Sequence, residues 1–176
     1  AEEEETDKVV CIGVESVSGE VGDKVDVPIL LSDCETVDSV EFDLNYDSAA
    51  LSVVSVTPGD LFPAEYCVSN TDTPGCVSIA CCCELGLEGD GTLLTVRFEI
   101  LTATGSALTV TTHKTGERAE EVVSYIDEDY NQYFSYVSLT NGAVTVGTAA
   151  APDPLVTPWA PATPTPSPSP TPAPTA

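Results

Sequence analysis

The strongest constraint on the fold of this chain is an alternation of apolar and polar residues that begins at Ser39 and ends at Tyr46. The residues on the apolar side of this alternation are Val40, Phe42, Leu44 and Tyr46, and those on the polar side are Ser39, Glu41, Asp43 and Asn45. Successive side chains of a strand point to opposite faces of a sheet. The pattern therefore predicts a strand with one face in the core and a row of carboxylates and amides facing solvent.

Further short segments with strand patterns follow one another along the chain, separated by turn residues such as Gly22-Asp23, Pro58-Gly59 and Asn141-Gly142. The predicted strands are residues 9–14, 25–31, 40–46, 51–56, 66–69, 76–82, 92–101, 107–112, 134–139 and 143–146. Many short alternating strands joined by regular turns are typical of a β-sandwich or barrel. We therefore predict an all-β domain.

The composition divides the chain into three parts. Residues 1–8 form an acidic tail, residues 9–147 carry the strand patterns, and residues 148–176 hold ten of the 14 prolines. Pro/Thr-rich segments favour an extended polyproline-like conformation, which suits a spacer between modules. We expect residues 148–176 to be a linker that joins this domain to other modules of a longer protein.

Charge and motif content exclude several classes of function. The net charge of −24 is unfavourable for nucleic acid, which needs Lys and Arg to neutralise its phosphates. No apolar run reaches the length of about 18 residues that membrane insertion requires. The sequence contains one histidine, His113, and no nucleophile-elbow, HExxH or P-loop motif. We therefore expect a protein that is not an enzyme.

Seven cysteines are present, so at least one thiol has no partner within the chain. Cys81 and Cys83 share the parity of the apolar residues around them, which predicts that they point into the core and that Cys82 points outward. Cys67 and Cys76 flank a turn, and a hairpin there would place them opposite one another. A disulfide between these two is one alternative, and reduced thiols are the other.

Two groups of loop residues suggest ligands. Asp127, Asp129 and Asn131 match the start of a calcium loop, but the Gly and Glu that an EF-hand needs later in the loop are replaced by Gln132 and Ser138. A looser oxygen site at these three residues and a solvated acidic loop both remain open. The aromatic cluster is a candidate sugar platform, although such residues often close the end of a sandwich; it consists of Tyr125, Tyr130, Tyr133, Phe134 and Tyr136.

Four segments, in this order, resemble the cohesins, which are β-sandwich modules of cellulosome scaffold proteins. The segments are VESVSGEVGDKVDVPILLSD (14–33), FDLNYDSAALSVVSVTPGDLF (42–62), GDGTLLTVRFEI (89–100) and NGAVTVG (141–147). The resemblance covers about residues 9–147 and is closest to the type I cohesins. It implies a β-sandwich with jelly-roll topology and about nine strands.

The resemblance also implies a function. Cohesins bind the dockerins of enzymes or scaffold proteins through an exposed sheet face, and so assemble extracellular complexes that degrade polysaccharides. It implies no cofactor on this module, calcium on the dockerin partner, and a secreted or cell-surface location. The partner-binding positions that it indicates are Ser39, Glu41, Asp43, Ala80, Cys82 and Glu84. A carbohydrate-binding β-sandwich is the alternative.

Overall fold

A computed structural model describes residues 9–111, 123–129, 131–134 and 136–147. The described residues form eleven strands and one short 3₁₀ helix, η1. In chain order the elements are β1 (Val9–Val14), β2 (Val17–Gly19), β3 (Lys24–Asn45), β4 (Leu51–Pro58), η1 (Ala64–Tyr66), β5 (Cys67–Asn70), β6 (Cys76–Ile100), β7 (Ser106–Thr111), β8 (Val123–Ile126), β9 (Gln132–Phe134), β10 (Tyr136–Thr140) and β11 (Gly142–Val146). The all-β prediction is confirmed, and no described helix is both long and apolar enough to cross a membrane.

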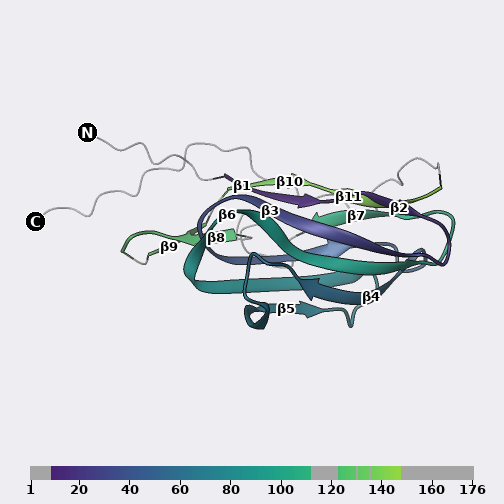
Figure 1. The fold of residues 1–176 in the computed structure, drawn as a ribbon, viewed down its shortest axis with the longest axis horizontal. Coiled ribbons are helices and arrows are strands. Elements are labelled where there is room, and N and C mark those ends of the chain that lie inside the picture. The colour runs from purple at the N-terminus through teal and green to yellow at the C-terminus, as the bar shows by residue number, and fades with distance from the viewer. Residues whose placement is uncertain (1–8, 112–122, 130, 135, 148–176) are drawn as a thin grey trace, which may run out of the picture.

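Two long antiparallel strands, β3 and β6, organise the sandwich. Each of them combines two strands that the sequence predicts as separate, and they pair from Lys24 opposite Glu99 to Asn45 opposite Cys76. Both ribbons curve along the length of the molecule (Figure 1). Because β3 and β6 run on through both layers of the sandwich, one hydrogen-bonded network connects the two layers.

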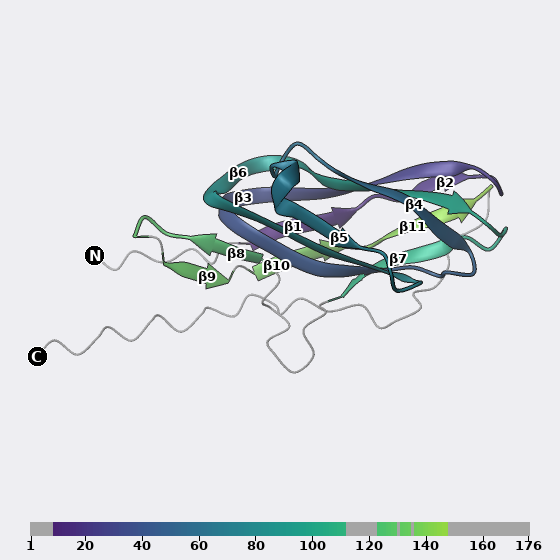
Figure 2. The ribbon, with the colours of Figure 1, turned by 90° about the horizontal axis from the view of Figure 1, so that it is seen from below.

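Each half of these long strands has different neighbours. The first half of β3 pairs with β1, and the second half of β6 pairs with β4, which gives the layer β10-β1-β3-β6-β4. The second half of β3 pairs with β7 and β8, and the first half of β6 pairs with β5. Figure 2 shows β5 running beside β6 in this second layer, whose outer face holds the candidate site.

A corner between Leu31 and Ser39 carries β3 from one layer to the other. The pairing with β6 shifts register several times in this segment, and Asp33 and Thr36 have positive φ angles of 59° and 53°. Bulges of this kind bend a strand without ending its pairing, and sandwich strands use them to pass between sheets. The sequence predicts two separate strands, 25–31 and 40–46, on either side of this corner, whereas the structure continues one strand through it.

Thr36 is the strained residue of this corner. A β-branched residue rarely adopts a positive φ, and the buried Thr36 hydroxyl has no hydrogen-bond partner among the described residues. Replacing Thr36 by glycine is expected to raise the free energy of unfolding by about 0.5–1 kcal/mol, measured by urea denaturation. The exposed Thr57 in β4 is the matched control, because glycine there should lower stability. An equal loss in both variants would contradict the strain argument.

The core lies between the layers and is built from the inward faces that the alternation predicts. Phe42 and Ile79 are opposite one another on β3 and β6 and are fully buried. Tyr46 contacts Phe98 edge-to-face, with ring centroids 5.1 Å apart. The predicted side-chain directions of the cysteine run are confirmed, because Cys81 is buried, Cys82 is exposed, and Cys83 packs partly buried against the core.

Candidate functional site

The outer face of the layer β5-β6-β3 brings the predicted partner-binding positions together. Residues directly opposite in an antiparallel pair lie on the same face of the sheet. The rows across these strands are Ser39 with Cys82, Glu41 with Ala80 and Val68, and Asp43 with Ser78 and Asn70. Five positions predicted from two distant segments therefore form one surface. Glu84 continues β6, but its side chain lies outside the described residues.

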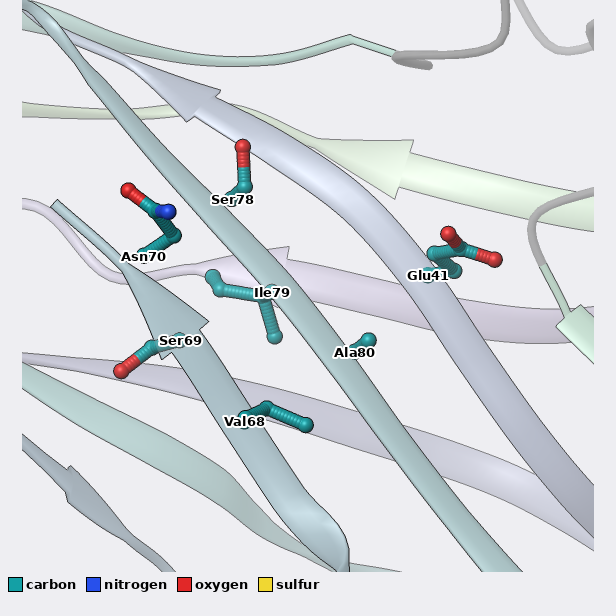
Figure 3. Close-up of a pocket in the computed structure, with 7 residues that line it drawn as sticks. All are labelled: Glu41, Val68, Ser69, Asn70, Ser78, Ile79 and Ala80. Atoms are coloured by element: carbon teal, nitrogen blue, oxygen red, sulfur yellow. The ribbon is translucent and has the colours of Figure 1, made fainter. Parts of the chain in front are cut away.

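The middle of this surface is an open hollow of about 280 Å³. Figure 3 shows the side chains that line it, which come from β3, β6 and β5 and are Glu41, Ala80, Ser78, Ile79, Val68, Ser69 and Asn70. At its centre, Ala80 separates Glu41 from Val68, whose side chain is 67 % exposed. The hollow thus combines a small apolar floor, an exposed apolar side chain and a carboxylate.

Sequence reasoning did not assign three residues of this surface to partner binding. Ser78 shares the parity of Ala80 and Cys82, so the alternation places it on the outer face. Val68 and Asn70 join the surface only through the pairing of β5 with β6, in which they lie opposite Ala80 and Ser78. No local pattern indicates that register, because it depends on the turn that follows Asn70.

The electrostatic character of the surface is acidic. Glu41 and Asp43 contribute carboxylates, and both basic residues of the described chain, Lys24 and Arg97, lie on the other layer. Arg97 is engaged there by Asp26, with 2.7 Å between its Nε and the carboxylate Oδ1. This guanidinium lowers the pKa of the Asp26 carboxyl by donating hydrogen bonds to it. The candidate surface therefore favours a partner that carries basic or hydrogen-bond-donating groups.

One end of the surface is held rigidly by β7. The Asn45 side-chain amide donates to Thr111 Oγ1 at 2.6 Å and to the Thr109 carbonyl at 3.2 Å. At the other end, the exposed Cys82 thiol makes a long contact of 3.9 Å to the Tyr66 carbonyl. Because the sheet is preformed along its length, a partner would not have to order it on binding.

The predicted position of Cys67 opposite Cys76 is wrong. The hairpin places Cys67 opposite Cys81, while Cys76 lies opposite Asn45 at the far end of the ladder. The prediction assumed a turn centred within residues 69–75, but the ladder closes on Asn70 and Ser78. All seven cysteines are free thiols in the structure.

The candidate calcium residues lie in the turn between β8 and β9. Asp127 Oδ1 accepts the backbone N–H groups of Asp129 at 2.9 Å and Asn131 at 2.8 Å, and Asn131 Nδ2 lies 3.1 Å from Asp127 Oδ2. The Asp127 carboxylate thus closes this turn. Across the described ranges no three His, Cys, Asp or Glu residues gather as metal ligands would.

The aromatic cluster falls largely outside the described part of the chain. Tyr130 lies outside the described residues, and the side chains of Tyr133, Phe134 and Tyr136 are likewise not described. Tyr125 is half-buried on β8, opposite Val37.

An open sheet face with a small apolar centre and hydrogen-bonding groups around it, on a preformed β-sandwich, is compatible with a class of protein that binds other proteins through a surface. The comparisons with known families identify which one. The model of the cohesin domain matches residues 10–146, and the chain belongs to the cohesin domain family.

Individual relatives agree with this assignment. This chain is 33 % identical to Cellulose-binding protein A of Clostridium cellulovorans over 111 residues. The match covers 60 % of this chain and 6 % of that relative's length. CaCohA2 of Clostridium acetobutylicum, solved in complex with CaDoc0917, is 31 % identical, with a TM-score of 0.65 over 78 % of this chain and 99 % of CaCohA2.

A third relative shares the fold at lower identity. The seventh ScaB type I cohesin of Pseudobacteroides cellulosolvens is 22 % identical and has a TM-score of 0.68, covering 84 % of this chain and 96 % of that cohesin. The predicted β-sandwich of the cohesin type is therefore confirmed. The eleven observed strands include the three-residue segments β2 and β9, in addition to the longer strands of the sandwich.

Proposed function

We propose that this chain is a non-catalytic receptor for dockerins, which it binds through the outer face of β5, β6 and β3. The observation that carries the proposal is the register that aligns Ser39, Glu41 and Asp43 with Cys82, Ala80 and Ser78. These positions include five that the family resemblance indicates for partner binding, and they come from segments about 40 residues apart.

One of the solved relatives supports the same partner class. CaCohA2 was solved as a complex with CaDoc0917, and the sixth cohesin of scaffoldin B from Acetivibrio cellulolyticus was solved in complex with a dockerin. The A. cellulolyticus cohesin is 22 % identical to this chain, so it supports only the fold. CaCohA2 is 31 % identical to this chain and supports the partner class as well.

The physical mechanism is rigid-body recognition. The small Ala80 at the centre lets a helix of the partner approach the sheet closely, and Val68 offers an exposed apolar contact beside it. Glu41 and Asp43 accept hydrogen bonds from basic or hydroxyl groups of the partner. A receptor that is already ordered loses little conformational entropy on binding, which favours affinity from a modest area.

The rest of the proposal concerns context. The module itself needs no cofactor. Calcium binds to the dockerin and keeps the dockerin folded. The Pro/Thr-rich residues 148–176 link the module to others of the same chain, and the whole protein is secreted or displayed at the cell surface. There it would gather polysaccharide-degrading enzymes into one complex.

Calorimetric titration against a panel of dockerins tests this function directly. We expect a 1:1 complex with at least one dockerin in calcium, and loss of the complex when EDTA removes calcium from the dockerin. The titration is carried out in a reducing buffer, which excludes artefacts from oxidation of the seven free thiols. Absence of binding across a broad panel, together with binding to an insoluble polysaccharide, would contradict the proposal and favour the carbohydrate-binding alternative.

A further inference from the structure

Cys67 and Cys81 form a cross-strand pair on the inward face of the second layer. They lie directly opposite one another on β5 and β6. The Cα atoms of opposite residues in an antiparallel pair are about 4.5–5.5 Å apart, which lies within the range of about 4.4–6.8 Å that disulfides span. The register therefore places the two cysteines at a backbone separation that a disulfide can span.

The two thiols differ in exposure. Cys81 is 2 % exposed, whereas Cys67 is only half-buried at the edge of the sheet. Burial raises the pKa of both thiols, most strongly that of Cys81, while the neighbouring Cys81 thiol partly lowers the pKa of Cys67 and Cys67 raises that of Cys81 further. Cys67 is thus the thiol that an external reagent reaches and that ionises more readily.

The neighbouring cysteines are placed less favourably for the same bond. Cys82 follows Cys81 but points to the outer face, where it is exposed. Cys76 lies five residues away along β6, opposite Asn45 of β3. Cys83 shares the inward face, but it lies two residues beyond the end of the ladder between β5 and β6. The register therefore selects Cys81 as the partner of Cys67.

We propose that Cys67 and Cys81 form a disulfide by exchange with a low-molecular-weight disulfide such as oxidised glutathione. The Cys67 thiol loses its proton and attacks one sulfur of the reagent, forming a mixed disulfide and releasing one glutathione thiolate. The Cys81 thiol then loses its proton and attacks the Cys67 sulfur, which expels the second glutathione thiolate. Two protein thiols are oxidised, one small disulfide is reduced to two thiols, and the two protons neutralise the thiolates released.

The bond would tether the edge strand to the rest of the sandwich. Among the described elements β5 pairs with β6 and with no other strand, so its four residues depend on that ladder. The bond would enclose the turn between the two strands and stabilise the side of the hollow that carries Val68 and Asn70. This inference rests on the register of β5 and β6 and does not depend on the proposed dockerin binding.

The test is incubation of the full chain with oxidised glutathione, followed by digestion under non-reducing conditions. Cleavage before Asp72 separates Cys67 from the peptide that holds Cys76, Cys81, Cys82 and Cys83. We expect these two peptides to be joined, and fragmentation to place the link at Cys81. We also expect the midpoint of thermal unfolding to rise by about 5–10 °C, and dithiothreitol to reverse the rise.

Single variants assign the bond. Cys76→Ser should still form the link and show the same thermal shift, whereas Cys67→Ser and Cys81→Ala should lose both. Because burial raises both thiol pKa values, the rate of bond formation should increase steadily from pH 7 to pH 9. A link from Cys67 to any other cysteine, or a glutathione adduct that persists on Cys67 while Cys81 stays reduced, would overturn the proposal.

Discussion

The Glu41→Lys variant is expected to lose dockerin binding by about 100-fold or more while keeping its fold. Glu41 lies in the middle of the outer face, opposite Ala80, and borders the hollow. Lysine at this position replaces a hydrogen-bond acceptor by a cation. The acidic surface favours a partner with basic or hydrogen-bond-donating groups, and these groups would then face a positive charge. Removing one partner of a charge pair at the centre of an interface costs about 2–5 kcal/mol of binding free energy. Most of this range corresponds to a loss of affinity of about 100-fold or more.

Titration calorimetry of the variant against the cognate dockerin measures this effect. Glu15→Lys is the matched control, since Glu15 is exposed between β1 and β2 and the substitution changes the net charge equally. We expect the control to bind within about threefold of the wild type, because surface charges far from an interface are screened by salt. If both variants lost affinity equally, net charge would explain the effect and the assignment of the face would be wrong.

Phe42→Ala is expected to produce the largest loss of stability among alanine substitutions on β3. Phe42 is fully buried opposite Ile79, one position along the strand from Glu41. Removing a buried aromatic ring forfeits its transfer free energy and leaves a cavity, which together cost about 3–5 kcal/mol. Urea denaturation should therefore show a lower midpoint with little change in slope.

Phe42→Leu separates packing from other causes. Leucine keeps most of the apolar volume, so its cost should stay below about 2 kcal/mol. The fraction of Phe42→Ala that remains folded should bind dockerin with nearly the wild-type affinity, because the ring faces away from the partner. A loss of less than about 1 kcal/mol in Phe42→Ala would mean that β3 does not pack in the register described.

Glu41 and Phe42 are adjacent on β3, yet their substitutions should affect different properties of the protein. Glu41 should govern binding and hardly affect stability, and Phe42 should do the reverse. The two substitutions together test the central geometric claim, which is that β3 presents one face to the core and the other to a partner.

The sequence alone was sufficient for the strand faces. The alternation from Ser39 to Tyr46 predicted that Phe42 is buried and Glu41 is not, and the parity of the cysteine run predicted the directions of Cys81 and Cys82. These predictions succeeded because side chains of a strand alternate whatever its neighbours are. The order of the four cohesin-like segments added the topology, which local patterns do not contain.

Only the tertiary structure decided the pairings between strands. In the structure β3 continues through the corner at Asp33 and Thr36. Val68 and Asn70 lie beside Ala80 and Ser78. The residue opposite Cys67 is Cys81, where the sequence had suggested Cys76. Register depends on turn geometry, on bulges and on the packing of distant segments, and a shift of a few residues leaves the local pattern unchanged. The sequence therefore determined which side chains face outward, and the fold determined which of them meet.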